Sequence, residues 1–393
     1  MLALLITTAI QAMVAMAALT MPVMAPEVAR ALGTSPAYIG VFIAILYVGA
    51  VLSSLGAGSA VARFGAIRTS QAGLLLCAAG LVLCSVPWLP AVAAGAFVIG
   101  MGYGPITPAS SHLLARTTPA HRMSLVFSIK QTGVPLGGVL AGALVPAMLL
   151  ALGWQAALLC VAAVNVLCAV LAQPLRAELD ADRASDGPRQ FARLAGPLRL
   201  VGSHPALRLL AGCSFFFSMA QMTVATYLVT YLTNSLAYGI VTAGFALSVT
   251  QVGGTGGRIL WGYVADRWLG PRRTLIVLAW LMCASAVATA LLHPALPLPV
   301  VLAVCAVFGV SAIGWNGVYL SEVARRAPAG QASAATGASL AVTFLGAVLG
   351  GPMVSVLSTQ AQSYRAGFVM VAIATAACGL ALWRSRALAS PAQ

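Results

Sequence analysis

The stretch that decides the fold is Gly262-Tyr-Val-Ala-Asp266-Arg267-Trp-Leu-Gly270-Pro-Arg272-Arg273, a short charged segment between two long apolar runs. A second segment repeats its glycine and arginine positions 204 residues earlier, and 205 residues earlier from Gly65 onward, with the sequence Gly58-Ser-Ala-Val-Ala62-Arg63-Phe-Gly65-Ala-Ile-Arg68. It also separates two apolar runs. The chain therefore holds two copies of one structural unit, and these segments mark the same place in each copy.

The repeat extends beyond these two segments. Gln11 matches Gln221 at a shift of 210 residues, and Val48-Gly49 matches Val252-Gly253 at a shift of 204. At a shift of 209 residues, the matches are Ala115-Arg116, Pro119, Ser124 and Gly137 with Ala324-Arg325, Pro328, Ser333 and Gly346. The two copies run in the same direction. Parallel repeats of this kind are typical of one class of transporter, which binds substrate between its halves near the bilayer midplane.

The composition indicates that lipid is the solvent. The 393 residues are 61% hydrophobic and only 7% charged, whereas a soluble domain carries about 25% charged residues. Since a helix needs about 20 apolar residues to cross a bilayer, we expect an all-α membrane protein with twelve transmembrane helices in two pseudo-symmetric six-helix bundles. The expected spans are 2–24, 37–60, 70–87, 91–115, 123–148, 155–174, 206–232, 237–262, 273–292, 298–322, 331–358 and 364–385.

One long polar segment divides the chain. We expect a six-helix bundle over 1–174, a cytoplasmic loop over 175–205 and a second bundle over 206–393. Placing the N-terminus in the cytoplasm leaves only Arg30 and Arg365 on the outer side, and by the positive-inside rule this puts both termini in the cytoplasm. The cytoplasmic residues in that orientation are Arg63, Arg68, Arg116, Arg122, Arg176, Arg183, Arg189, Arg193, Arg199, Arg208, Arg267, Arg272, Arg273, Arg325, Arg326, Arg384 and Arg386.

The charge distribution argues against nucleic acid as a partner. The formal net charge is +14, but the basic residues stand singly or in pairs between apolar runs and form no patch with interleaved aromatic residues. The eight cysteines and four histidines have no metal-binding spacing, so we expect no metal, no cofactor and no enzymatic activity. The first apolar run follows no basic residue and is too long for a signal core, so we expect a membrane span there.

The two charged segments resemble the G-x-x-x-D-R-x-G-x-R loop of the major facilitator superfamily, over the whole chain. The second copy has one residue added before Gly270, and the first copy has Ala62 where the acid is expected. The resemblance implies alternating access between two six-helix halves. The candidate gating residues are Gly58, Arg63, Arg68, Gly262, Asp266, Arg267, Arg273 and Glu322.

Asp266 has a physical role that can be predicted without the family. A glycine lets two helices approach closely, and an acid at the membrane edge favours the positive N-terminus of a neighbouring helix. Pseudo-symmetry directs Asp266 to the start of the fifth helix, near Met123 and Ser124. We expect Asp266 with Arg267 either to latch the cytoplasmic side closed or to anchor a static loop, and Ala62 implies that the first half has no equivalent latch.

The fifth expected helix carries Gly133, Gly137, Gly138 and Gly142 together with Pro135. This pattern is similar to the G-x-x-x-G-P-x-x-G-G signature of antiporters in the superfamily, with the proline displaced by one residue. Two interpretations remain open. One is export by antiport, and the other is close helix packing through small residues four apart.

Two cations are expected inside the bilayer, where an ionisable side chain costs about 2.5–3.5 kcal/mol and needs a partner or a water-filled cavity. Lys130 lies about 10 Å into its helix, where it either anchors an anionic substrate or extends its stem to the interface. Arg258 lies about 12 Å inside. It either pairs with Glu322 at a gate or binds a substrate anion.

Uncharged polar residues complete the candidate substrate site. Gln11 and Gln221 occupy matching positions on the first helix of each half, where an amide either binds substrate or bridges helices. The other candidates, which in the alternative interpretation pack or anchor the membrane interface, are Gln131, Tyr47, Gln251, Tyr103, Tyr227, Trp315 and Asn316.

We therefore expect a secondary transporter, because the chain has no Walker-type phosphate loop for a nucleotide. Two deep cations favour a small organic anion, such as a mono- or dicarboxylate, as the substrate. The alternative is a proton-coupled antiporter that exports an amphipathic metabolite or drug, while a channel or a membrane-embedded enzyme is disfavoured. We expect a monomer in a bacterial cytoplasmic (inner) membrane, with protons as the candidate coupling ion.

Overall fold

The computed structural model describes residues 2–34, 39–181 and 195–385, and within these ranges it contains helices and connecting turns without strands. Four of the arginines expected on the cytoplasmic side lie outside the described residues, namely Arg183, Arg189, Arg193 and Arg386. The all-α fold class predicted from the sequence is confirmed.

The helices follow the predicted spans closely. Those up to residue 179 are α1 (Leu2–Val23), α2 (Ala25–Ala31), α3 (Ile39–Phe64), α4 (Ala66–Cys84), α5 (Leu89–Tyr103), α6 (Ile106–Thr117), η2 (Ala120–Arg122), α7 (Met123–Gln131), α8 (Gly133–Leu152), α9 (Trp154–Leu171), η3 (Gln173–Leu175) and α10 (Arg176–Leu179). The later ones are α11 (Ala195–Ser203), α12 (Pro205–Leu236), α13 (Ile240–Val264), η5 (Ala265–Leu269), α14 (Gly270–Ala290), α15 (Leu298–Ala312), α16 (Asn316–Arg326), α17 (Ala332–Gln360) and α18 (Arg365–Arg384).

The number of membrane crossings matches the prediction. In the described part of the chain, 11 helical stretches are long and apolar enough to cross a bilayer. One of them, Thr242–Ala290, is 49 residues long and joins α13 to α14 through the π-helical turn η5. Because one crossing takes about 20 residues, this stretch supplies two crossings, and the total is twelve.

Close helix packing repeats in the two halves. A side chain at Gly100 of α5 would clash with the carbonyl oxygen of Leu46 in α3, and a side chain at Gly309 of α15 would clash with that of Thr250 in α13. Gly309 lies 209 residues after Gly100, and Thr250 lies 204 residues after Leu46. The sequence repeat therefore corresponds to a structural repeat, in which glycine lets the same two helices cross at backbone distance.

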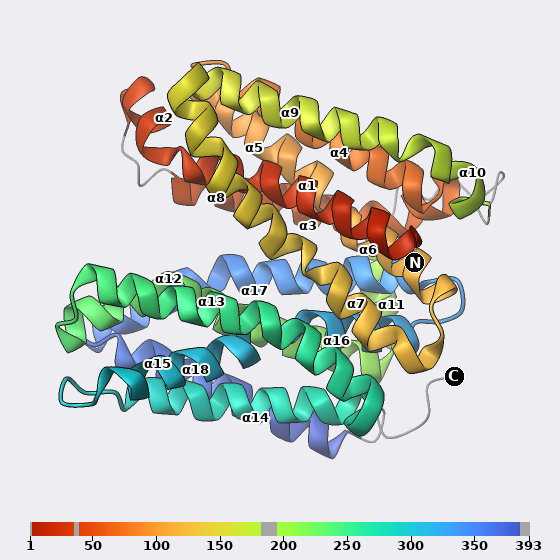
Figure 1. Cartoon of the computed structure of the whole chain (residues 1–393). Coiled ribbons are helices and arrows are strands. Elements are labelled where there is room, and N and C mark those ends of the chain that lie inside the picture. Colours follow the sequence, from red (N-terminus) through yellow and green to blue (C-terminus); the bar gives the residue numbers. More distant parts are fainter. Residues whose placement is uncertain (1, 35–38, 182–194, 386–393) are drawn as a thin grey trace. The chain divides into compact units, whose positions relative to one another are not determined.

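The described chain divides into two compact units. Unit 1 comprises 1–118, 130–201 and 327–341, and unit 2 comprises 119–129, 202–326 and 342–393. In unit 1, α4 packs against α5 and α9, and α1 packs against α8; in unit 2, α14 packs against α18 (Figure 1). Each unit thus takes most of its residues from one half of the sequence and one short segment from the other half.

Three of the predicted spans are interrupted helices. The span predicted over 91–115 breaks at Gly104-Pro105, that over 123–148 breaks at Thr132, and that over 298–322 breaks between Ala312 and Asn316. Proline explains the second break, since Pro135 has no N–H to donate to the carbonyl of Gln131, where α7 ends. The first and third breaks lie at equivalent positions of the repeat, because Gly314 is 209 residues after Pro105.

Candidate functional site

A buried polar cluster surrounds Lys130, the last-turn cation of α7. Its side chain is only 1% exposed. The ammonium Nζ donates hydrogen bonds to Gln11 Oε1 at 2.7 Å, to Gln131 Oε1 at 3.0 Å and to Thr107 Oγ1 at 3.1 Å. All three acceptors are uncharged, so these bonds satisfy the donors of the ammonium without neutralising its charge.

Two helix breaks bring this cluster together. Lys130 lies just before the break at Thr132, and Thr107 lies in the first turn of α6, just after the break at Gly104-Pro105. Gln11 reaches them from the middle of α1 and also accepts a hydrogen bond from Thr107 Oγ1 at 3.0 Å. Of the two interpretations of Lys130, the structure supports a buried ammonium over one that extends to the membrane interface.

A second cluster occupies the corresponding place in unit 2. Gln221 Oε1 accepts hydrogen bonds from Trp315 Nε1 and from Asn316 Nδ2, both at 3.2 Å. Asn316 begins α16 at the break and lies 209 residues after Thr107. The Gln221–Asn316 pair is therefore the repeat-related copy of the Gln11–Thr107 pair, with a buried tryptophan in place of the lysine as the additional donor.

Arg258 lies beside the same break. It is 4% exposed, and its Nε donates a hydrogen bond to the carbonyl oxygen of Ile313 at 3.2 Å. Glu322, which the sequence suggested as its partner, accepts a hydrogen bond from Arg326 Nε at 2.9 Å. Arg258 thus contacts the backbone where α15 ends, and Glu322 pairs with a residue of its own helix, α16. The pair between Arg258 and Glu322 stays a prediction.

The other substrate-site candidates are Tyr227, Gln251, Tyr47 and Tyr103. Tyr227 donates a hydrogen bond from its hydroxyl to the carbonyl of Gly351 at 2.7 Å, and its ring lies 6.4 Å from that of Tyr364. Gln251 is exposed on α13, and Tyr47 and Tyr103 are half-buried on α3 and α5. Thr107 was not among the candidates, although it contacts both Gln11 and Lys130.

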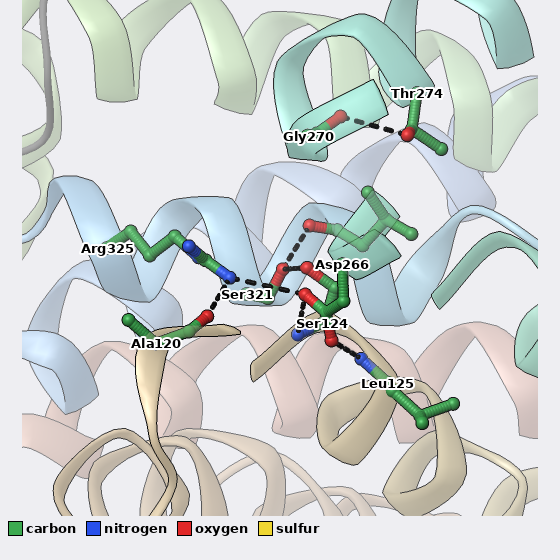
Figure 2. Close-up of polar contacts among 9 residues, drawn as sticks. Ala120, Ser124, Leu125, Asp266, Gly270, Thr274, Ser321 and Arg325 are labelled. Atoms are coloured by element: carbon green, nitrogen blue, oxygen red, sulfur yellow. Dashed lines mark hydrogen bonds and ion pairs between the residues drawn. The ribbon is translucent and has the colours of Figure 1, made fainter. Parts of the chain in front are cut away.

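Asp266 caps the N-terminus of α7 (Figure 2). Its carboxylate accepts hydrogen bonds from the backbone N–H of Ser124 at 3.1 Å and of Leu125 at 2.7 Å. These amides have no acceptor within α7, and the positive end of the helix dipole stabilises the carboxylate. This is the contact that pseudo-symmetry predicted for Asp266. Beside it, the hydroxyl of Ser321 donates a hydrogen bond to Ser124 Oγ at 3.0 Å.

The cation beside Asp266 is Arg325, where the sequence suggested Arg267. Arg325 Nη2 lies 3.4 Å from Asp266 Oδ1 and 2.6 Å from the carbonyl oxygen of Ala120 (Figure 2). Arg267 and Arg273 are exposed. Because η5 is a π-helical turn, side chains near Asp266 are rotated from α-helical positions, which sequence spacing alone does not predict.

Glycines let the segments around Asp266 approach one another within unit 2. A side chain at Gly262 of α13 or at Gly317 of α16 would clash with Ser128 of α7. Three helices therefore meet at one serine. The predicted gating glycine Gly262 lies close to Ser128 for packing, and Gly317 has the same packing role without having been predicted.

The first-half copy of the loop is built differently. A side chain at Gly58 would clash with Ala334 of α17, and Ala62 is exposed. Arg63 lies over the ring of Phe64 at 5.2 Å. The copy thus retains the close helix contact but has no carboxylate at the position of Asp266, as the sequence indicated.

A different acid, Asp180, caps the helix that follows this loop. Asp180 is 3% exposed, and it accepts hydrogen bonds from the backbone N–H of Ile67 at 2.8 Å and of Arg68 at 3.0 Å, at the start of α4. Arg116 holds the adjacent backbone through the carbonyl of Leu179 at 2.9 Å. The carboxylate–amide arrangement of Asp266 therefore recurs in unit 1, with the acid supplied by the segment after α10.

The glycines of the fifth span pack against α1. A side chain at Gly133 would meet the carbonyl of Thr8, and one at Gly137 would clash with the carbonyl of Ala12. At Gly142, in contrast, a Cβ atom would have nothing within 4 Å. Close helix packing accounts for the first two glycines.

The fold and its sites define a polytopic helical membrane protein with two six-helix repeats and polar clusters at interrupted helices. The chain belongs to the Major Facilitator Superfamily, whose family model matches residues 4–351. This is a family of transporters, not of enzymes. Among the residues that the structure describes, no group of three His, Cys, Asp or Glu side chains could hold a metal ion.

Several known proteins are similar to this chain. Two uncharacterized MFS-type transporters of Mycobacterium tuberculosis, from strains CDC 1551 / Oshkosh and ATCC 25618 / H37Rv, are each 28% identical over 242 residues. The match covers 61% of this chain and 53% of each relative, so it spans about half the length of these relatives. A gentisate transporter of Corynebacterium glutamicum is 25% identical over 371 residues, covering 89% of this chain and 78% of that protein.

Solved structures share the fold. The fucose:proton symporter of E. coli has a TM-score of 0.79 at 16% identity, covering 98% of this chain and 99% of that chain. A human organic anion transporter has a TM-score of 0.77 at 15% identity, covering 96% and 98% of the two chains. These structures confirm the predicted twelve-helix, two-bundle architecture.

Proposed function

We propose that this protein is a secondary transporter that moves a small organic anion, of the carboxylate class, by alternating access. The observation that carries the proposal is the buried ammonium of Lys130, whose hydrogen bonds to Gln11, Thr107 and Gln131 go to uncharged oxygens. A lysine held by these oxygens is positioned to attract an incoming anion. Burying it without such a role would be costly in a membrane protein.

The second cluster supports the same proposal. Gln221, Trp315 and Asn316 place amide and indole groups at the repeat-related position in unit 2, and such groups suit the uncharged part of an organic acid. One relative that carries a substrate in its name is a gentisate transporter, and gentisate is an aromatic carboxylate. An aromatic or aliphatic monocarboxylate is therefore the first class to test.

The direct test measures uptake of an organic-acid panel that includes gentisate, using the purified protein in proteoliposomes with and without a pH gradient. We expect saturable uptake and counterflow of one acid, whereas a channel would give neither. Lys130→Gln should abolish uptake at low substrate concentration, and Lys130→Arg should keep part of it because the charge remains. Unchanged apparent affinity in Lys130→Gln would show that Lys130 is not the anion anchor.

The uptake measurement with a pH gradient also tests the alternative function, which is proton-coupled antiport. A proton-coupled antiporter that exports an amphipathic metabolite or drug would accumulate no acid on the panel, but would move amphipathic cations or neutral compounds against an inward proton gradient. The helix-packing role of Gly133 and Gly137 removes the need to explain these glycines by antiport. Acid uptake driven by the pH gradient would instead support protons as a coupling ion for the proposed substrate class.

We further infer a gating role for Asp266. Its two hydrogen bonds fasten the start of α7 to the loop between α13 and α14, and Arg325 adds a cation at the same point. A contact made of one carboxylate and two amides can open and close as a unit. We therefore assign Asp266, Arg325 and Ser124 to a latch that holds one state of the transport cycle.

The orientation belongs to the proposal as well. The excess of arginine in one set of loops favours a cytoplasmic location for both termini, and the relatives of this chain include bacterial proteins. We therefore propose that it is a monomer in a bacterial cytoplasmic membrane.

A further inference from the structure

A groove opens between helices on the surface of unit 1, outside both polar clusters. It has a volume of about 850 Å³ and lies among α3, α4, α9 and the α5–α6 break. That volume falls within the range of about 300–1,000 Å³ typical of small-molecule sites. Its lining is predominantly apolar and includes the exposed side chains of Leu52, Phe64, Leu75 and Leu76.

One end of the groove carries a positive charge. Arg68, which lines the groove at the start of α4, is exposed, and its guanidinium has no ion-pair or hydrogen-bond partner among the described residues. The nearby acid, Asp180, directs its carboxylate oxygens to the backbone amides of Ile67 and Arg68. The charge of Arg68 is therefore available to a ligand.

The other polar side chains of the groove already have partners within the unit. Gln71 Nε2 donates to the carbonyl of Ala169 at 2.8 Å and to Gln173 Oε1 at 2.9 Å. Thr69 Oγ1 donates to the carbonyl of Gly65 at 2.7 Å. A ligand in this groove thus meets one cationic end and a long apolar body.

We propose that this groove binds an anionic phospholipid, with the headgroup phosphate at Arg68 and an acyl chain along α3 and α4. Leu76 lies eight residues after Arg68, about 12 Å farther along α4, which matches a charged headgroup followed by a hydrocarbon chain. The helices around the groove are membrane spans, so lipid is the solvent at its opening. This site is separate from the proposed substrate site, and its test does not depend on transport.

The binding test uses the full-length purified protein and native mass spectrometry. The protein is titrated with phosphatidylglycerol and with phosphatidylcholine of identical acyl chains. One basic side chain near an anionic lipid is worth about a fivefold change in binding. We expect phosphatidylglycerol to bind about fivefold more tightly than phosphatidylcholine, in which the choline ammonium already balances the phosphate charge. Arg68→Gln should remove most of that difference by weakening phosphatidylglycerol binding more than phosphatidylcholine binding.

The apolar part of the groove is tested by filling it. Gly56 lines the groove, and a Cβ at this position has nothing within 4 Å, so Gly56→Phe should fold and occupy the acyl-chain space. We expect it to reduce the affinity for both lipids at least tenfold. Gly212→Phe on α12 is the matched control, because a Cβ at the exposed Gly212 also has nothing within 4 Å, and it should bind both lipids as the wild type does.

Two results would overturn the proposal. One is equal binding of the two lipids by the wild-type protein. The other is wild-type lipid binding by Gly56→Phe. Should Gly56→Phe not fold, Ala72→Phe fills the same groove from the exposed face of α4 and carries the same expectations.

Discussion

At the scale of single residues, one substitution at Gln11, which accepts a hydrogen bond from Lys130, should preserve thermal stability while abolishing anion transport. Gln11→Glu replaces the side-chain amide by a carboxylate of the same shape. The carboxylate would pair with the ammonium of Lys130, whose Nζ lies 2.7 Å from Gln11 Oε1. The donor of this bond is already charged, and the carboxylate adds a coulombic attraction to it, so we expect the melting temperature in detergent to be unchanged or raised. Anion uptake should nevertheless be lost, because the new carboxylate neutralises Lys130.

The matched control for this change is Gln221→Glu. Gln221 accepts its bonds from the uncharged Trp315 and Asn316, so a carboxylate at this half-buried position has no cation among these partners and should lower the melting temperature. A Gln11→Glu protein that still takes up the substrate anion at the wild-type rate would contradict the role assigned to Lys130.

The latch makes a second residue-scale prediction. Asp266→Asn leaves one acceptor oxygen for the two amides of Ser124 and Leu125, and a hydrogen bond to a charged group contributes about 1.5–3 kcal/mol. The equilibrium should therefore shift about tenfold or more toward an open contact. We expect a cysteine introduced at Ser124, which is fully buried, to react with a thiol reagent correspondingly faster in the Asp266→Asn background.

Asp180→Asn provides the control, because Asp180 makes the same kind of contact with the amides of Ile67 and Arg68. It should weaken the start of α4 without changing the reactivity of a cysteine at position 124. The latch assignment fails if Asp266→Asn leaves both that reactivity and the transport rate at their wild-type values.

The sequence predicted some of these residues and missed others for identifiable reasons. The contact of Asp266 with the start of α7 followed from the repeat, because symmetry transfers a contact from one copy to the other. Arg325 was not predicted, since the π-helical turn at Ala265–Leu269 alters which side chains face the carboxylate. Thr107 was missed, although the sequence contained an indication of its position. Gly104-Pro105 interrupts the apolar run just before Thr107, and Gly314 occupies the equivalent position of the second repeat.

At the scale of helices, hydrophobic run lengths predicted all twelve spans to within a few residues. The interruptions in three of them were not predicted, because an apolar run gives the length of a span but not the continuity of its hydrogen bonds. Discontinuous helices at matching positions of two repeats are a recognised indicator of a transporter binding site. Gly104-Pro105 and Gly314 form such a pair, and both polar clusters lie beside it.

The packing of α8 on α1 gives a prediction at this scale. Gly137→Leu would clash with the carbonyl of Ala12, whereas Gly142→Leu places its side chain where nothing lies within 4 Å. Overpacking costs about 1–3 kcal/mol. We expect the Gly137→Leu protein to melt several degrees below the wild type in detergent, while Gly142→Leu melts with the wild type. Equal melting of the two variants would contradict a packing role for Gly137.

At the scale of the whole molecule, the repeat explains why the architecture could be predicted while the substrate could not. Each half matches the other at glycines and loop charges, which determine helix crossings and termini. The two polar clusters differ, since one centres on Lys130 and the other on Trp315. Substrate chemistry depends on these differences. A sequence repeat predicts only the features that both copies share, so it does not predict the substrate.

The prediction that applies to the whole chain is its orientation in the membrane, with both termini in the cytoplasm. Labelling the two ends of one helix is sufficient to test it. Ser203 and Ser235 are exposed near opposite ends of α12, Pro205–Leu236, because Ser203 lies two residues before its start and Ser235 lies in its last turn. Each serine differs from cysteine by one atom. The eight native cysteines are buried or half-buried, so they give little background labelling.

With both termini in the cytoplasm, an impermeant maleimide applied to the periplasmic side should label Ser235→Cys. It should label Ser203→Cys only after the membrane is permeabilised. The reverse pattern would place the arginine-rich loops outside and contradict the orientation on which the assignment of a cytoplasmic latch depends.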